Sequence, residues 1–468
     1  DIVDLQWRGI RQLYLLQAIP VDLLTEQGRR ILGELERKFP GERASDNPRI
    51  TEGGFIDSPI PSDIARKMSN RDWLHALQKY QKGVRHREFL KGGAEQLARV
   101  LTELIKETPE RFYLLLKRLP DTIDTPYVEA FLNGLAESDA PVEWLFNVVR
   151  RFALQPEREI TRTISWALRK RVQDDIPDDM VILLEGYVRK AQGNDETRRE
   201  QQERGLGDGY YNSDRGSALV TLMRIFDQRK DVERKWELIE YVAGDPSAVL
   251  RAGAIQELSH MLRVDRERAI TLFENLLDGY APILKSQHAQ EFLHYAIHTH
   301  FSRMKGFVRA LLESDDEPCQ QRGAELACMA AVSPYIELTE EERAETRAMA
   351  EEAVRGSVAC RRGVAHVYAV NVDKVPGVTY ELAKLLDDED EQVQNMLNSF
   401  LYHLQPDHIF TLRSFLEAYA ASRAMRGKGL YEFTEYLWRY GQDDPQWALS
   451  VIDRILDNTY PVGDMRWG

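Results

Sequence analysis

The chain has 468 residues and a formal net charge of -14, with 43% hydrophobic and 29% charged residues. This composition is ordinary for a folded protein and excludes global disorder. No uncharged apolar stretch approaches the roughly 20 residues that a membrane-spanning helix needs, so we expect no membrane contact.

Helix signals dominate the first half of the chain. Residues 1–110 are predicted to form an N-terminal helical segment that contains an irregular, Gly/Pro-rich stretch at 41–61. Ser69 precedes a predicted helix with Trp73 on its apolar side.

Residues 111–204 are predicted to form helical hairpins. Proline fits the first helical turn, where its missing N–H costs nothing, and a preceding Thr or Asp caps the helix. Such start signals are Thr108-Pro109, Thr125-Pro126, Asp245-Pro246 and Asp444-Pro445.

The segment 205–405 repeats an arginine, small residue and apolar residue at the start of successive helices. The glycines of these segments are 37, 70 and 40 residues apart, and 70 is two steps of 35. This period is typical of two-helix repeats, and acidic turns before the helices favour the HEAT kind. We therefore predict an all-α protein, an α-solenoid of HEAT-like helical-hairpin repeats. The segments are Arg215-Gly216-Ser217-Ala218, Arg251-Ala252-Gly253-Ala254, Arg322-Gly323-Ala324-Glu325 and Arg362-Gly363-Val364-Ala365.

Glycine inside a helix costs about 1 kcal/mol relative to alanine, so its recurrence needs a reason. A missing side chain lets a neighbouring helix approach closely, and in a solenoid that contact recurs once per repeat. We expect the missing repeat start near Ala289 and a further copy at 392–401. Residues 406–468 are predicted to be C-terminal helices followed by a frayed tail from 457.

The second half of the chain is acidic. Residues 241–468 contain 23 basic and 35 acidic residues, whereas 1–240 contain 39 and 41. This disfavours direct nucleic-acid binding and favours a protein partner with a basic surface, although acidity that only keeps a large scaffold soluble is an equal alternative. We predict partner contacts at the acidic turns and at an aromatic pair in the polar stretch 192–216. The residues are Asp315, Asp316, Glu317, Asp387, Asp388, Tyr210 and Tyr211.

The sequence contains few signs of catalytic chemistry. It has no phosphate-binding P-loop, no Gly-x-Ser-x-Gly elbow and no His-Glu-x-x-His motif, so we predict no catalytic residue, cofactor or metal. His294 and His298 are four residues apart on a helix and could share a metal, but a carboxylate at the usual spacing is missing. The alternative is a pair of surface or inter-repeat histidines. The cysteines Cys319, Cys328 and Cys360 form no CxxC pair and fit buried helical positions in a reducing cytoplasm.

Three segments carry a resemblance to known proteins. One is Ser58-Pro-Ile-Pro with the following Met68-Ser-Asn-Arg-Asp-Trp-Leu74 helix, and the others are Asn212-Ser-Asp-Arg-Gly-Ser-Ala218 and Gln321-Arg-Gly-Ala-Glu-Leu-Ala-Cys-Met-Ala-Ala331. They resemble stretches in the C-terminal helical-repeat region of bacterial antiviral STAND NTPases with a NACHT-like core. The resemblance covers about residues 1–405, and its motifs are structural rather than catalytic.

The resemblance implies a sensor. In such proteins an effector and an ATPase precede the repeats, which bind a viral protein, typically a terminase or portal, and binding triggers oligomerisation. This chain contains neither the P-loop nor an effector and begins with Asp1 rather than Met, so we expect a piece of a longer protein. Two alternatives remain: an intracellular scaffold or adaptor with no defence role, and an enzyme with a site across repeats near His294 and His298.

Overall fold

The computed structural model describes residues 9–41, 56–81, 92–153, 160–190, 208–278, 281–334, 336, 338–375, 377–426 and 428–459. Helices dominate these residues, and none of them belongs to a β-strand. The prediction of an all-α protein is confirmed. Within these ranges no helix is both long and apolar enough to cross a membrane.

The chain divides into two compact units. The first consists of residues 1–104 with 115–130, and the second of 105–114 with 131–468. The predicted boundaries at 110, 204 and 405 stay a prediction. Helices assigned wholly or mainly to the first unit are α2 (Ile10–Gln17), η1 (Val21–Leu23), α3 (Glu26–Lys38), α4 (Ser62–Lys67), α5 (Asn70–Lys79) and α6 (Ala94–Glu107), while α8 (Thr125–Ala136) contributes to both units.

Local sequence explains the helix predicted after Ser69. Ser69 accepts a hydrogen bond from the Asp72 amide at 3.2 Å, and the Asp72 carboxylate accepts one from the Ser69 amide at 2.9 Å. This reciprocal cap starts α5, whose Trp73 is completely buried. The prediction is confirmed. Most of the irregular stretch 41–61 lies outside the described residues.

The second unit is a succession of helices. In chain order it comprises α7 (Pro109–Leu116), α9 (Val142–Phe152), α10 (Thr161–Lys170), α11 (Asp178–Arg189), η2 (Asp208–Asn212), α13 (Asp214–Arg229), α14 (Val232–Ala243), α15 (Ala248–Met261), α16 (Arg266–Leu277), η3 (Ala281–Lys285), α17 (Gln287–Leu312), α18 (Glu317–Val332), α19 (Glu340–Val354), α20 (Val358–Val370), α21 (Val378–Ala383), α22 (Glu391–Leu397), η4 (Asn398–His403), α23 (His408–Thr411), α24 (Arg413–Ala420), α25 (Lys428–Tyr440), η5 (Gly441–Asp443) and α26 (Pro445–Thr459).

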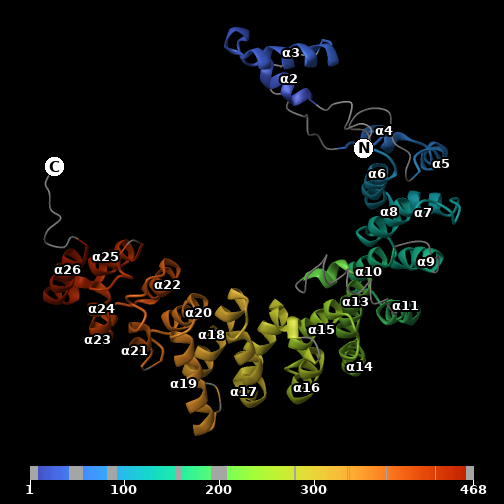
Figure 1. The fold of residues 1–468 in the computed structure, drawn as a ribbon. Coiled ribbons are helices and arrows are strands. Elements are labelled where there is room, and N and C mark those ends of the chain that lie inside the picture. Colours follow the sequence, from blue (N-terminus) through green and yellow to red (C-terminus); the bar gives the residue numbers. More distant parts are fainter. Residues whose placement is uncertain are drawn as a thin grey trace. The chain divides into compact units, whose positions relative to one another are not determined.

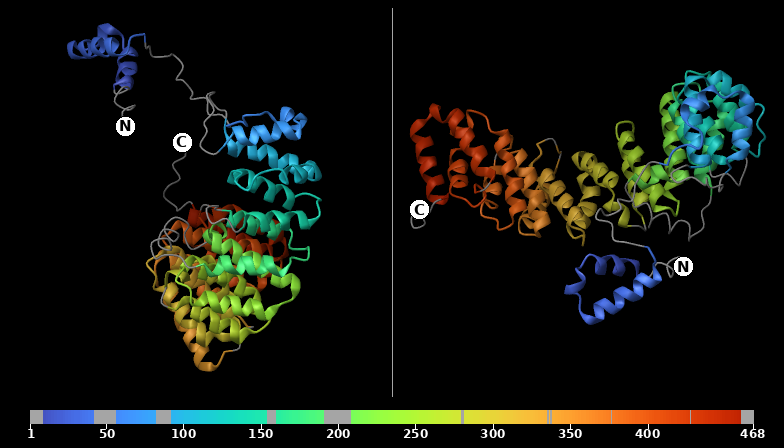
Figure 2. Two further views of the ribbon diagram at one scale, coloured as in Figure 1. Left: turned by 90° about the vertical axis from the view of Figure 1, so that its right-hand side faces the viewer. Right: turned by 90° about the horizontal axis from the view of Figure 1, so that it is seen from above.

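Six of these helices form a row, which we call the capped row. Helices α13, α15, α17, α18, α20 and α22 pack one against the next in chain order (Figures 1 and 2). A side chain just before each helix accepts a hydrogen bond from the amide three residues later, which satisfies one of the free N–H groups of the first turn. The capping residues are Ser213, Ser247, Ser286, Asp316, Ser357 and Asp390.

The caps locate the repeat starts that the sequence left uncertain. Ser286 begins the helix expected near Ala289, and Asp390 begins the one expected at 392–401, although a 3-10 turn replaces its second half. The predicted start at Asp245-Pro246 is displaced by two residues. Ser247 is the cap there, because Asp245 is engaged by an arginine instead.

The first five capped-row helices each have a second helical segment. Helices α14, α16, α19 and α21 pack against α13, α15, α18 and α20 respectively. Helix α17 supplies both members, because His300 has non-helical backbone angles (φ -135°, ψ 44°) and divides it in two. The three cysteines are buried in α18 and α20, as predicted.

The recurring glycines permit close helix contacts, as the sequence predicted. A Cβ atom at Gly216 would lie 2.1 Å from the carbonyl oxygen of Tyr210, and one at Gly363 would lie 2.3 Å from that of Gln321. At Gly323 it would lie 2.6 Å from the amide nitrogen of Leu312. Real Cβ contacts are essentially never this short, so a side chain at these positions would push the neighbouring backbone away.

Two segments at the edges of the predicted repeats differ from expectation. Part of the stretch 192–216 is ordered as η2 and the start of α13, and 191–207 lie outside the described residues. Helix α26 continues to Thr459, so a frayed tail from 457 is wrong for residues 457–459, while 460–468 also lie outside the described part. Apolar contacts between α24 and α26 hold that last helix.

We expect Gly363→Ala to lower the free energy of unfolding by about 1–3 kcal/mol, because the new methyl group meets backbone that cannot rotate away. Gly306→Ala in α17 is the matched control, since nothing lies within 4 Å of its Cβ position. The control should be neutral or stabilising by up to about 1 kcal/mol. Urea unfolding followed by circular dichroism measures both; equal effects would contradict close approach at Gly363.

Candidate functional site: acidic turns and polar ladder

The first acidic turn precedes α18. Asp316 is its cap and accepts a hydrogen bond from the Cys319 amide at 3.1 Å. Its neighbours point outward: the Asp315 side chain is 91% exposed, and that of Glu317 is 75% exposed. Lys285 Nζ lies 2.9 Å from Asp315, and Arg362 lies 3.7 Å from Glu317. This turn thus combines one structural carboxylate with two surface carboxylates that have cationic neighbours.

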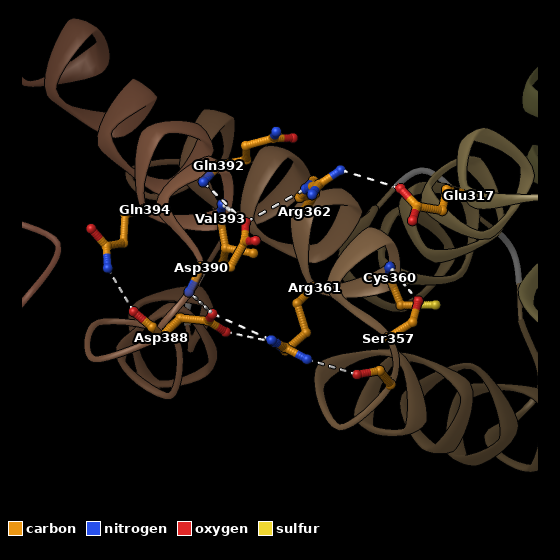
Figure 3. A network of polar contacts seen from close by, with 11 residues as sticks. Glu317, Ser357, Cys360, Arg361, Arg362, Asp388, Asp390, Gln392, Val393 and Gln394 are labelled. Atoms are coloured by element: carbon orange, nitrogen blue, oxygen red, sulfur yellow. Dashed lines mark hydrogen bonds and ion pairs between the residues drawn. The ribbon is translucent and has the colours of Figure 1, made fainter.

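The second acidic turn precedes α22 (Figure 3). The Asp388 side chain is only 6% exposed and accepts hydrogen bonds from Arg361, with Nε at 2.6 Å and Nη2 at 3.4 Å. The same guanidinium donates to the carbonyl of Gly356 at 2.9 Å. Asp388 also accepts from the Asp390 amide at 2.9 Å, and the Gln394 side chain donates to its carbonyl at 2.7 Å. Asp388 is therefore the centre of a joint between two consecutive hairpins.

Similar joints occur earlier in the array. Arg215 donates to Asp245, with Nη1 3.0 Å from Oδ1, and both side chains are buried. Arg251 Nη1 donates to the carbonyl of Asp278 at 2.9 Å. Each arginine lies near the start of a capped-row helix and reaches the turn before the following one. Of the repeated arginines, Arg215 and Arg251 thus reach the next turn, whereas Arg322 donates to Glu325 of its own helix at 2.8 Å.

These contacts divide the acidic residues predicted to bind a partner. Asp316 and Asp388 are committed to the fold, since one caps a helix and the other is buried against an arginine. Asp315, Glu317 and Asp387 are exposed, and Asp387 accepts a hydrogen bond from the Arg423 amide at 2.8 Å. Only these last three remain candidates for surface contact.

The aromatic pair is mostly internal. Tyr210 is completely buried, and its ring occupies the space where a Cβ at Gly253 would lie, 2.6 Å from Cδ2. A surface contact through Tyr210 is therefore a wrong prediction, because the ring packs against α15. Tyr211 is partly buried, and its hydroxyl donates to Gln256 Oε1 at 3.1 Å.

The predicted histidine pair lies together on α17. The rings of His294 and His298 are 5.8 Å apart between centroids in an edge-to-face arrangement. Burial lowers the pKa of both, aided by nearby arginines, Arg322 for His294 and Arg266 for His298. Across the described ranges, no group of three or more His, Cys, Asp and Glu side chains is placed to hold a metal ion.

A line of titratable residues crosses the middle of the capped row. We call it the polar ladder, and it takes one residue from each of α13, α15, α17, α18 and α20, eight to eleven positions after the cap. Positions equally far from their caps meet across the row: Glu325 Oε1 lies 3.2 Å from His366 Nδ1. The members are Arg224, Glu257, His294, Glu325 and His366.

Glu325 accepts more hydrogen bonds than the other glutamate of the ladder. Burial opposes its ionisation, but hydrogen bonds from His366, Arg322 and Gln321 outweigh that effect and lower its pKa to about 2. The same hydrogen bond to Glu325 raises the pKa of His366. The pair is thus an ionised carboxylate beside an imidazole that favours its protonated form.

Glu257, the other glutamate of the ladder, has only distant charges to stabilise its ionised form. It is buried on α15, which raises the pKa of its carboxyl to about 7, and only the more distant charges of Lys235 and Arg224 oppose the rise. The charge of Asp227 raises this pKa further.

The sequence reasoning missed Glu257, Glu325 and His366 as a group. Their signal was a titratable residue eight to eleven positions after each cap, which becomes visible only once the caps are located.

No family model matches this chain, and none of the curated proteins compared with it is significantly similar. The functional proposal for this chain therefore rests on the packing of its helices and the charge of its acidic turns.

We expect Asp388→Ala to lower the free energy of unfolding by about 1–3 kcal/mol, because it leaves donors of Arg361 and the Asp390 amide without their acceptor. Glu389→Ala is the neighbouring control: its side chain is 91% exposed and 3.9 Å from Arg423, so the loss should stay within about 0.5 kcal/mol. Thermal and urea unfolding provide the comparison. Equal losses of unfolding free energy in the two variants would show that the Arg361–Asp388 contact does not stabilise the protein.

We also expect the contribution of Glu257 to stability to fall as pH rises from about 4.5 to 7. Its folded pKa is above the unfolded value, so the folded state holds an extra proton in that window and loses it as pH rises. Glu257→Gln should remove this component, on the order of 1–3 kcal/mol, and raise stability at pH 8 relative to pH 5. The exposed Glu237→Gln serves as control. The same pH slope in Glu257→Gln as in the parent chain would refute the assignment.

Proposed function

We propose that the array from α13 to α22 is a HEAT-like α-solenoid that acts as a recognition module for a protein partner. The observation that carries this proposal is the capped row itself, in which each helix has the same type of start and packs on the next. Repeats that contact only their neighbours form an extended surface rather than a closed core. Such surfaces serve binding by many contacts spread over several repeats.

The charge of the array supports a basic partner. Residues 241–468 carry twelve more acidic than basic residues, and Asp315, Glu317, Asp387 and Glu389 are exposed at the turns. Surface carboxylates of this kind attract a positively charged protein surface over about a Debye length and disfavour duplex nucleic acid. Their nearby cations reduce the attraction only in part, because exposed ion pairs are weak.

We further propose that the chain is the sensor of a phage-defence STAND NTPase and recognises a viral protein such as a terminase or portal. The resemblance of residues 57–80, 212–218 and 321–331 to such sensors supports this assignment. In this proposal the protein acts in the cytoplasm, and a longer parent chain supplies the NTPase and oligomerises when the solenoid is occupied. This chain's own part is binding.

The test is direct binding of the immobilised chain to purified phage terminase large subunit and to purified portal protein, with a major capsid protein as the unrelated phage control. We expect association with terminase or portal that slows at least about ten-fold between 0.05 M and 0.5 M salt. Replacing Asp315, Glu317 and Asp387 together by lysine should slow association about ten-fold at low salt and leave folding intact, since none of the three is buried.

The control replaces Asp63, Glu95 and Glu110 by lysine. These residues are also exposed but lie outside the acidic half, so association should change little. Failure of both phage proteins to bind at low salt, where attraction is strongest, would exclude them as partners. Equal effects of the two triple variants would exclude the acidic turns as the contact surface.

A further inference from the structure

A pocket of about 330 Å³ opens between helices α18, α19, α20 and α21. Its apolar lining comes from the end of α18, the middle of α19 and the segment that leads into α21. Ala331, Ala350 and Val378 are among these residues, and Ala350 and Val378 are almost completely buried. The volume is at the lower end of the range for small-molecule sites, so the pocket suits one compact apolar group.

Three charged residues border this pocket, and they are not equivalent. Glu381 has Lys384 Nζ at 2.6 Å, and Glu351 has Arg355 Nη2 at 3.5 Å. Both carboxylates are thus already accompanied by a cation from their own segment. Arg347, on α19, lies at the pocket edge and forms no ion pair or hydrogen bond with any described residue. The rim therefore carries two carboxylates, each with a cation close by in the chain, and one arginine without a partner among the described residues.

We propose that this pocket binds a carboxylate carried on a compact apolar body, with the carboxylate held by Arg347. A guanidinium accepts a carboxylate through two parallel hydrogen bonds, which gives direction as well as strength. The apolar body gains by leaving water for the lining of Ala350 and Val378. This chemistry occurs in a free aromatic or branched organic acid and at the C-terminal residue of a peptide. The proposal is independent of the partner bound at the acidic turns.

The experiment uses the full chain and phenylacetate as probe, with phenethylamine as the amine of similar shape, followed by ligand-observed NMR titration. We expect saturable phenylacetate binding with a dissociation constant of about 1 mM, and binding of phenethylamine at least about ten-fold weaker. Arg347→Gln should weaken phenylacetate binding about ten-fold or more, as expected for loss of a charged hydrogen-bond partner. Arg343→Gln, one turn earlier on α19 and outside the pocket lining, should leave it unchanged.

A second variant separates the cavity from the charge. Ala350→Met fills the pocket while Arg347 remains, so binding should disappear although the thermal unfolding temperature stays close to that of the parent chain. N-acetyl-glycyl-phenylalanine and its C-terminal amide then assign the source: an acid that binds at least ten-fold tighter than phenylacetate indicates a peptide terminus, and one that does not indicates a free organic acid. Tighter binding of phenethylamine than of phenylacetate, or equal binding by parent chain and Arg347→Gln, would overturn the proposal.

Discussion

Close contact between consecutive helices of the capped row is the constraint on which the rest of the second unit depends. At Gly216, Gly323 and Gly363 one helix lies directly against the backbone of another segment. Eleven of the sixteen residues of α13 are buried, because neighbours cover it on more than one side. Such a helix would expose apolar side chains to water if it were alone. Each helix therefore depends on its neighbours, and the interfaces between helices supply the stability.

The same geometry determines where charge is available. At the turns before α15, α18 and α22, a helix cap or an arginine of the preceding hairpin occupies a carboxylate, namely that of Asp245, Asp316, Asp388 or Asp390. The number of carboxylates in a turn is therefore larger than the number that a partner can reach. What remains for a partner is the smaller set of carboxylates that neither cap a helix nor accept from a buried guanidinium.

The polar ladder and the α18–α21 pocket place charged groups in two different physical settings. In the ladder, two glutamates are buried, and their pKa values diverge: about 2 for Glu325 and about 7 for Glu257. The difference arises because one carboxyl accepts several hydrogen bonds and the other is mainly deprived of water. In the pocket, each of two carboxylates has a cation close by in the chain, and Arg347 is the third charged residue of the lining.

The sequence by itself determined the helical class and the role of the glycines, because caps, apolar periodicity and tolerance for close backbone contact are local properties. It also identified several helix starts, including those after Ser69 and Asp444. It could not separate Asp388 from Asp387, or recognise that Tyr210 is internal, because exposure depends on which neighbour arrives from a distant part of the chain. Only the tertiary structure decided which Asp and Arg residues neutralise each other, since pairs such as Arg361 and Asp388 are 27 residues apart and meet only when two hairpins stack.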